Sequence, residues 1–420
     1  MAQTALDMTG PRPGTAVQVY AVYGGISPDT ATMTELLHAG TVLRQVPLDL
    51  LVAADTGRPA LLPPILGRLA THRGQPLAGV VGFDDWWTTA LTALNHDFPL
   101  AAARRLVTDK AALYAALTAH GVATAPCIPG PLSIDLLTAA LDRFGPAPIL
   151  KPATGAGSRG VYRYQPHRSI TDNLAVYQRL RELGHIDTSI PTIAAAYLGG
   201  DDALEISVDV IVCAGTPTHA VVHEKCTATA ADPFVDQVMI TPPVRSAIIT
   251  ALPELPATIT GVITTLQLRD GVLHVELRLH EGVWHVLDVG VRPGSGLVSH
   301  AVHATTGVDP RLIHLAASIG RPVPPSTVNS RTGRHQAACI ACCYLTDDRR
   351  DSITLGAQQH LADALRTADD VIGWHLNAAD LDDQVYRPDA GLSIGIAAHT
   401  PAAAMTRLRT LVEPHGYTTT

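Results

Sequence analysis

Aromatic residues are scarce in this sequence, since Phe, Trp and Tyr together make up 4% of its 420 residues. Charged residues are also few, at 16%, whereas apolar residues make up 46%. The interior must therefore be built mainly from Ala, Val, Leu and Ile rather than from rings. This composition is typical of a soluble chain with a well-buried core.

The sequence has no run of basic residues, and its formal net charge is −8. Nucleic acids and acidic membrane surfaces are bound through clustered Lys and Arg, so neither is an expected partner. No apolar run approaches the roughly 18–20 residues of a membrane span, and residues 1–14 lack the pattern of a signal peptide. We therefore expect a cytoplasmic protein that acts on small molecules.

Cysteine is sparse, with six residues, which fits a reducing compartment. Three of them form a CxxCC cluster at residues 339–343. A zinc site would need further ligands at finger-like spacing, and the apolar run 337–345 is typical of a buried strand. We favour the strand over the zinc site.

A chain of this length exceeds one ordinary core and predicts two to four structural units. Apolar runs at 17–23, 42–46 and 77–81, with helical spacing between and after them, predict the start of an open α/β sheet. Asp109 is a candidate cap for a helix that ends before Gly121. Strands dominate the segment 192–291, and the prolines at 322–325 indicate a linker to a small α+β tail. The predicted units are residues 1–105, 106–192, 193–320 and 326–420.

A glycine-rich segment between two predicted strands is a candidate phosphate lid. It begins at Lys151 and runs through Gly155, Gly157, Ser158 and Gly160. Glycines allow consecutive N–H groups to point at phosphate oxygens, and a lysine adds positive charge. A flexible surface hairpin is the alternative interpretation of this segment.

The segment 271–292 predicts a β-hairpin with one apolar and one polar face, because its residues alternate strictly. A three-residue turn would pair Glu276 with Asp288, whereas a two-residue turn would place them on opposite faces. We expect the former. Two facing carboxylates repel unless a cation lies between them, and such oxygen ligands suit Mg²⁺.

Arg292 lies further along the same predicted strand, where it is suited to bind a phosphoryl oxygen or a developing oxyanion. The alternative is a solvated hairpin with ordinary cross-strand charges. His274, His280 and His285 also lie on this hairpin; we expect them mostly at its surface and assign none of them as a catalytic base.

A third segment, residues 192–209, alternates so that Glu205 begins a polar strand face, where a carboxylate is suited to bind ribose hydroxyls. The strand that returns from it ends at Lys225.

These segments, in this order and at these spacings, resemble the ATP-grasp superfamily, and in particular its carboxylate–amine ligases, which include L-amino acid ligases. The resemblance covers residues 105–300 well. It implies a multidomain α/β (α+β) architecture: a Rossmann-like N-terminal domain, a two-lobed nucleotide-binding core and a small α+β C-terminal domain.

The resemblance also implies roles for individual residues. ATP would be bound by two lysines, the glycine-rich lid, the hinge and a ribose-binding residue, and metal by two carboxylates. The implied residues are Lys110, Lys151, Gly155, Gly157, Ser158, Gly160, Ala196, Tyr197, Leu198 and Glu205 for ATP, Glu276 and Asp288 for metal, and Arg292 and Lys225 for catalysis.

Two departures from the family pattern stand out. The last strand reads Asp288-Val-Gly290-Val-Arg292 where the family usually has Glu-x-Asn-x-Arg, so an amide ligand is missing and binding of a second metal ion is in doubt. The hinge reads Ala194-Ala-Ala-Tyr197 where acidic residues are common, so adenine contacts there would have to come from backbone groups.

The implied function is an ATP-dependent ligase that forms an amide through an acyl phosphate and releases ADP and phosphate. One or two Mg²⁺ ions, with Mn²⁺ as an alternative, would serve as cofactor, and a homodimer is a further expectation. The competing hypotheses are a catalytically degenerate nucleotide-binding protein, a carboxylase that activates bicarbonate, and a kinase that stops at phosphate transfer.

Overall fold

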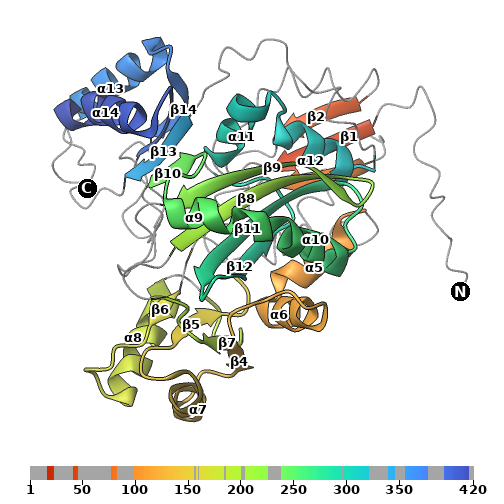
Figure 1. Cartoon of the computed structure of the whole chain (residues 1–420), viewed down its shortest axis with the longest axis vertical. Helices are drawn as coiled ribbons and strands as arrows, with labels where there is room; N and C mark the ends of the chain where they lie inside the picture. Colours follow the sequence, from red (N-terminus) through yellow and green to blue (C-terminus); the bar gives the residue numbers. More distant parts are fainter. Residues whose placement is uncertain are drawn as a thin grey trace, which may run out of the picture.

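In the part of the chain that the computed structural model describes, helices pack on three β-sheets (Figure 1). The architecture is a multidomain α/β fold, as expected from the sequence. The residues that the structure describes are 17–22, 41–45, 77–82, 99–155, 158, 160–183, 186–199, 204–225, 238–295, 297–320, 339–345, 355–376 and 392–415.

The N-terminal sheet has three parallel strands in the order β2-β1-β3. They are β1 (Val17–Val22), β2 (Thr41–Gln45) and β3 (Leu77–Gly82). All three predicted strands are therefore confirmed. The helices predicted between and after them lie outside the described residues.

A four-stranded sheet in the order β4-β7-β5-β6 forms a separate lobe, at the bottom of Figure 1. Leu137, Leu150, Tyr162 and Tyr177 form its buried core, to which the sheet and its two helices all contribute. The elements are β4 (Cys127–Gly130), α7 (Ile134–Phe144), β5 (Ile149–Pro152), β6 (Tyr162–Arg163), α8 (Ile170–Leu183) and β7 (Thr192–Ala195).

Two consecutive helices precede this lobe: α5 (Ala101–Thr108) and α6 (Lys110–Ala119). Asp109 separates them, and its carboxylate accepts from the N–H groups of Ala111 and Ala112, as its predicted capping role requires. The sequence interpretation did not include α5, which it assigned partly to the N-terminal unit.

The largest sheet has eight strands in the order β12-β11-β8-β9-β10-β13-β15-β14. Its first five strands are β8 (Leu204–Cys213), β9 (Thr216–Lys225), β10 (Val238–Thr241), β11 (Gly271–His280) and β12 (Val283–Gly290). The C-terminal elements are β13 (Cys339–Leu345), α13 (Leu355–Thr367), β14 (Val371–Leu376), β15 (Leu392–Ala398) and α14 (Pro401–Val412).

The C-terminal strands continue the central sheet, because β10 pairs antiparallel with β13. The predicted α+β content of this segment is present, but its strands do not form a sheet of their own among the described residues. The cysteines of the CxxCC cluster lie on β13, as the strand interpretation predicted. The predicted linker at 322–325 lies outside the described residues.

Helices α9 (Ser246–Ala251) and α10 (Leu255–Leu266), joined by a 3₁₀ turn at Leu252–Glu254, interrupt the strands between β10 and β11. The expectation of a strand-dominated segment missed them, since Ile, Val and Thr are frequent there and favour strands. Packing favours the helix, because Ile259, Val262 and Ile263 lie on one helical face that is buried in the main core.

This helical stretch also corrects another expectation. The sequence was expected to contain no apolar run long enough for a membrane span, but by length and composition alone Ser246–Leu266 is long and apolar enough to cross a membrane. One face of α10 is nevertheless part of the protein core with β8 and β11.

Candidate active site

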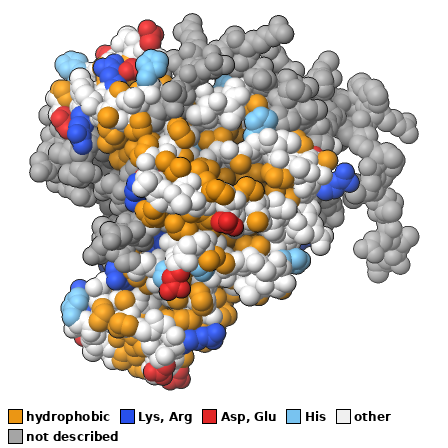
Figure 2. Space-filling view, in the orientation of Figure 1, with side chains coloured by type: hydrophobic (Ala, Val, Ile, Leu, Met, Phe, Trp, Pro, Cys, Tyr) orange, Lys and Arg blue, Asp and Glu red, His pale blue; other side chains and the backbone are white. Residues whose placement is uncertain are grey.

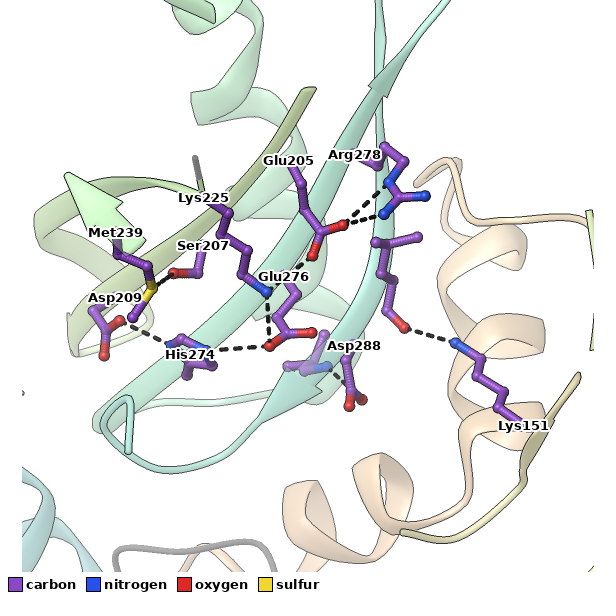
Figure 3. A network of polar contacts seen from close by, with 12 residues as sticks. Lys151, Glu205, Ser207, Asp209, Lys225, Met239, His274, Glu276, Arg278 and Asp288 are labelled. Atoms are coloured by element: carbon purple, nitrogen blue, oxygen red, sulfur yellow. Dashed lines mark hydrogen bonds and ion pairs between the residues drawn. The ribbon is translucent and has the colours of Figure 1, made fainter. Parts of the chain in front are cut away.

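The polar side chains of the central sheet share one face and stand in rows across its strands. Asp209 of β8 pairs with His274 of β11, and Glu205 pairs with Arg278. The intervening residues, such as Val208, belong to the hydrophobic core on the other face. The alternation read from the sequence therefore produces one continuous polar surface (Figure 3).

Glu276 and Asp288 face each other across β11 and β12, as predicted, but by a different route. The turn has two residues, Glu281 and Gly282, both with positive φ (51° and 78°), and not three as expected. A β-bulge restores the pairing: Leu277 pairs with Val286 and Glu276 with Asp288, so Leu287 is extra. The bulge, and not the turn, brings the carboxylates together.

The bulge also supplies an acceptor that the sequence does not reveal. The carbonyl of Leu287 accepts a hydrogen bond from the buried Tyr114 hydroxyl and another, at 3.2 Å, from Nζ of Lys151. Lys151 further donates to the Tyr114 oxygen at 2.5 Å. Burial lowers the pKa of Lys151, and the nearby Asp288 opposes that shift. Strand β12 thus positions the lysine of β5.

Lys110 contacts one of the two carboxylates predicted to bind metal. It is the first residue of α6, and its Nζ lies 2.5 Å from Oδ2 of Asp288, although the two residues are 178 positions apart. The backbone N–H of Lys110 also donates to the carbonyl of Ala153 at the end of β5. The two predicted ATP lysines therefore converge on the same strand, β12.

Lys225 connects two carboxylates on the sheet. Its ammonium lies 2.9 Å from Oε1 of Glu205 and 3.2 Å from Oε1 of Glu276, and the residue is 2% exposed. Arg278 binds the other oxygen of Glu205, with Nε at 3.1 Å. Both oxygens of Glu205 are thus engaged in an ionic network, and its predicted contact with ribose stays a prediction.

Glu276 and Asp288 are the accessible members of this buried network. Their side chains are 32% and 30% exposed, whereas those of Glu205 and Lys225 are below 10%. Burial acts to raise the pKa of Glu276, but Lys225 and His274 outweigh it and hold that pKa well below its usual range. The alternative of a solvated hairpin with ordinary surface charges does not fit these buried pairs.

His274 is not a surface residue, which corrects the expectation for the hairpin histidines. It is 8% exposed, and its Nδ1–H donates to Oδ2 of Asp209 at 2.9 Å. Burial lowers the pKa of His274, but Asp209 raises it more, to about 9. His223 lies 3.6 Å from the same carboxylate, and burial lowers its pKa to about 4. The sequence could have indicated that His274 belongs to the site, because it lies two residues before Glu276 and therefore on the same face of the strand.

Arg292 is buried directly after β12, and its guanidinium donates to the carbonyl of Pro293 at 2.8 Å. The next residue, Gly294, donates its N–H to Oδ1 of Asp209 at 2.6 Å. Gly290, at the position of the missing amide, pairs with His274 across the ladder and adds no side chain to that row. The segment after β12 is therefore tied to β8.

The predicted phosphate lid lies between β5 and β6, which pair antiparallel. Gly155 and Ser158 are exposed, while Ser158 and Gly160 have positive φ, at 55° and 67°. A Cβ at Gly160 would lie 2.5 Å from the terminal methyl of Ile186, which can move, so the positive φ is the main reason that this position favours glycine. Gly157 lies outside the described residues.

The predicted hinge, Ala196 to Leu198, follows β7 and links the two lobes. Ala196 donates its N–H to the carbonyl of Pro126, and Leu198 is buried. The guanidinium carbons of Arg163 and Arg278 lie 4.1 and 5.6 Å from the centre of the Tyr197 ring. One arginine comes from each lobe, so the hinge ring contacts both.

The donor chemistry at Glu276 and Asp288 fits a hard divalent cation. Among the described residues, no group of three or more His, Cys, Asp or Glu is arranged to hold a metal ion. A cation here would therefore take two carboxylates from the protein and complete its shell with water and phosphate, as Mg²⁺ usually does. In this structure the lysine ammonium groups lie against both carboxylates.

Residues 146–300 match the sequence model of the family described as ATP-grasp domain. This part of the chain is an ATP-grasp domain. It includes the predicted lid, the predicted hinge, Lys225, the paired carboxylates and Arg292, and Lys110 contacts it from helix α6, earlier in the chain. A comparison with curated protein sequences gave no match.

Solved structures share the fold over nearly the whole chain. An L-amino acid ligase from Bacillus licheniformis has 14% identity and a TM-score of 0.66, with 96% of this chain and 99% of that chain covered. An N5-carboxyaminoimidazole synthase from Aspergillus clavatus, in complex with ADP and 5-aminoimidazole ribonucleotide, has 15% identity and a TM-score of 0.63, with 95% and 98% covered.

A third structure is the biotin carboxylase domain dimer of a 2-oxoglutarate carboxylase from Hydrogenobacter thermophilus, in complex with MgADP, ADP and bicarbonate. It has 12% identity and a TM-score of 0.63, with 95% of this chain and 90% of that chain covered. At these identities the likeness concerns the fold alone, and it extends beyond the matched domain over most of the chain.

Proposed function

We propose that this protein is an ATP-dependent ligase that joins a small carboxylic acid to an amine. In the proposed reaction the carboxylate attacks the γ-phosphorus of ATP, and ADP leaves. The amine then attacks the carbonyl carbon of the acyl phosphate, phosphate leaves, and the amine loses a proton, so that an amide forms. The first substrate class is an amino acid or another small carboxylic acid.

The observation that carries this proposal is the convergence of Lys110, Lys151, Glu276 and Asp288. Two cationic groups for phosphates and two accessible carboxylates for a cation lie around one bulged strand, β12. Phosphoryl transfer needs charge neutralisation and alignment more than it needs a protein nucleophile. Four charges arranged in this way meet both needs.

Mg²⁺, held by Glu276 and Asp288, would neutralise charge on the ATP phosphates. The protein's own groups supply the rest. Lys110 and Lys151 would exchange their contacts on β12 for phosphate oxygens. The loop between β5 and β6 would cover the phosphates and exclude water, which would otherwise hydrolyse the acyl phosphate. Arg292 would stabilise the charge that develops on the transferred group.

The proposal retains a cytoplasmic location and a homodimer as expectations. The dimer is tested by sedimentation of the purified full-length chain across a range of protein concentrations. A mass that stays at the monomer value throughout would remove this expectation without affecting the ligase proposal.

The ligase is tested by ATP consumption in the presence of Mg²⁺, pooled amino acids and small carboxylic acids. We expect ADP and phosphate in equal amounts, together with a new amide mass. The variants Glu276→Gln and Asp288→Asn should lose most turnover, whereas Asp370→Asn, which breaks the Arg407 pair in the C-terminal segment, should keep it. Full turnover in Glu276→Gln would refute the metal assignment.

Other products would identify other functions. AMP in place of ADP would replace the acyl phosphate with an acyl adenylate. ADP release that depends on bicarbonate would favour the carboxylase, and a stable phosphorylated product would favour a kinase. ATP binding without turnover over a broad substrate pool would favour the degenerate nucleotide-binding protein, which Gly290 motivates.

A further inference from the structure

Asp209 is a buried junction between two parts of the site. Asp209 is 2% exposed. Its Oδ2 accepts a hydrogen bond from Nδ1–H of His274 at 2.9 Å, and its Oδ1 accepts one from the backbone N–H of Gly294 at 2.6 Å. A buried carboxylate with both oxygens bonded in this way is held rigidly, since losing either partner would leave it unsatisfied. Asp209 therefore links the residues that contact His274 to the backbone segment around Gly294.

Beyond His274 lies the metal-site carboxylate. Nε2 of His274 is 3.7 Å from Oε1 of Glu276, and Nζ of Lys225 is 3.2 Å from the same oxygen. Figure 3 shows the other oxygen of Glu276 directed away from both cations, on the side of Asp288. His274 and Lys225 thus anchor one oxygen and leave the second available for a cation.

Beyond Gly294 lies the segment that carries Arg292. A Cβ at Gly294 would lie 2.4 Å from Val298 and 2.9 Å from Asp209, so only glycine brings this backbone so close. The carbonyl of Gly294 also accepts from the Ser299 hydroxyl at 2.8 Å. Asp209 therefore fixes the backbone two residues after Arg292.

We propose that Asp209 and His274 are positioning residues, which hold the Glu276 carboxylate and the Arg292 segment in one fixed geometry for a cation–nucleotide complex. This inference rests on the proposed function for the identity of that complex, and it deepens it. The arrangement carboxylate–histidine–ligand resembles the outer shells that orient metal ligands in proteins. Loss of such a contact typically weakens metal binding by about 10–100-fold.

The test uses two substitutions of His274 whose side chains differ in length, so that only the longer one can contact Glu276. In His274→Asn the side-chain amide ends near the place of Nδ1, so it keeps the Asp209 contact but does not reach Glu276. In His274→Gln the amide ends near the place of Nε2 and reaches Glu276. Asp209→Asn removes the buried charge without changing the size of the side chain. His223→Asn is the matched control, because His223 also lies beside Asp209 and bonds Thr241, but makes no contact with Glu276.

The measurement is binding of Mn²⁺, followed by electron paramagnetic resonance, to the full-length protein with a non-hydrolysable ATP analogue. Thermal unfolding of each variant is recorded in parallel. We expect His274→Asn and Asp209→Asn to weaken Mn²⁺ binding by about 10–100-fold. His274→Gln should weaken it less than His274→Asn, because the glutamine keeps the Glu276 contact although it loses the bond to Asp209, and His223→Asn should change it hardly at all. A role confined to folding would lower the melting temperature and leave the Mn²⁺ affinity of the folded protein unchanged.

The outcomes separate this inference from the ligase proposal. Unchanged Mn²⁺ affinity in His274→Asn, or equal losses in His274→Asn and His274→Gln, would overturn the contact through Nε2 while ligase activity could still be found. Wild-type protein that binds Mn²⁺ and nucleotide but consumes no ATP would overturn the ligase and leave the positioning role supported by the variants. Absence of Mn²⁺ binding in the wild type would overturn the inference itself.

Discussion

Lys110 donates to Asp288 at 2.5 Å, so an ammonium group lies on the oxygen that the proposed metal ion would use. The pair links the first residue of α6 to the bulged end of β12. In the nucleotide-free protein a cation would therefore compete with Lys110, whereas ATP would give the lysine phosphate oxygens in exchange. We expect metal and nucleotide to bind together more readily than either binds alone.

The variant Lys110→Met tests this competition. Removal of the ammonium should raise the KM for ATP by roughly 10–100-fold, because hydrogen bonds to charged groups contribute about 1.5–3 kcal/mol. The same variant should bind Mn²⁺ more tightly than wild type in the absence of nucleotide. Steady-state kinetics and a Mn²⁺ titration measure the two effects.

Lys151→Met is the control for that titration. Lys151 contacts Tyr114 and the Leu287 carbonyl and forms no ion pair with Glu276 or Asp288. Its loss should raise the KM for ATP and leave nucleotide-free Mn²⁺ affinity within a few-fold of wild type. Tighter Mn²⁺ binding in both variants, or in neither, would contradict the specific role of Lys110.

Tyr114→Phe should weaken ATP binding by positioning Lys151 less well. The phenol donates to the Leu287 carbonyl and accepts from Lys151, so its removal deletes both bonds. We expect a several-fold rise in the KM for ATP and a loss of about 0.5–1.5 kcal/mol in the free energy of unfolding. Urea denaturation and an ATP titration measure these quantities.

Tyr162→Phe provides the comparison, since its hydroxyl also makes a buried bond, 2.7 Å to Asn173 in the lobe core, without a contact to Lys151. It should destabilise the protein by a similar amount and leave the KM for ATP unchanged. If the two variants changed the KM equally, the effect would come from stability and not from Lys151.

Gly160→Ala should distort the loop between β5 and β6. Its φ of 67° is unfavourable for alanine, and the added Cβ would lie 2.5 Å from Ile186. We expect a loss of about 1 kcal/mol or more in unfolding free energy and a higher KM for ATP. Gly145→Ala, in the same lobe with a φ of 82° and open space around its Cβ, carries the backbone strain alone. It should also destabilise the protein but leave ATP binding intact; an equal rise in the KM for ATP in both variants would argue against a specific role of the loop between β5 and β6.

Gly294→Ala should reduce turnover through Arg292. Its Cβ would meet Val298 at 2.4 Å and Asp209 at 2.9 Å, so the segment after β12 must shift. We expect the kcat to fall by about tenfold or more while the KM for ATP changes little, because the nucleotide lysines are not involved. A stopped assay over a range of ATP concentrations separates the two constants, and an unchanged kcat would show that the segment tolerates the shift.

The sequence by itself determined where most of the described strands lie and which face of each strand is polar. Alternation placed Glu205, Asp209 and Glu276 on polar faces, because successive strand side chains point to opposite sides. The helix cap at Asp109 and the glycine-rich loop after Lys151 could also be predicted from the sequence, since capping and positive φ depend on local residue types.

Helices α9 and α10 were not predicted, because their many Ile, Val and Thr residues favour strands. Helix α5 was also missed, although its Ala, Arg and Leu residues favour a helix. Burial against the main core decides for helix at Ile259 and Val262. The joining of β10 to β13 likewise depends on strands far apart in the sequence, which periodicity does not pair.

Only the tertiary structure decided how the site is assembled. The two-residue turn alone would have put Glu276 and Asp288 out of register, and the bulge at Leu287 reverses that outcome. Contacts between distant segments then place Lys110 on Asp288 and His274 between Asp209 and Glu276. Local sequence determines which face a side chain points to, whereas its partner depends on register and packing, which are set by the whole chain.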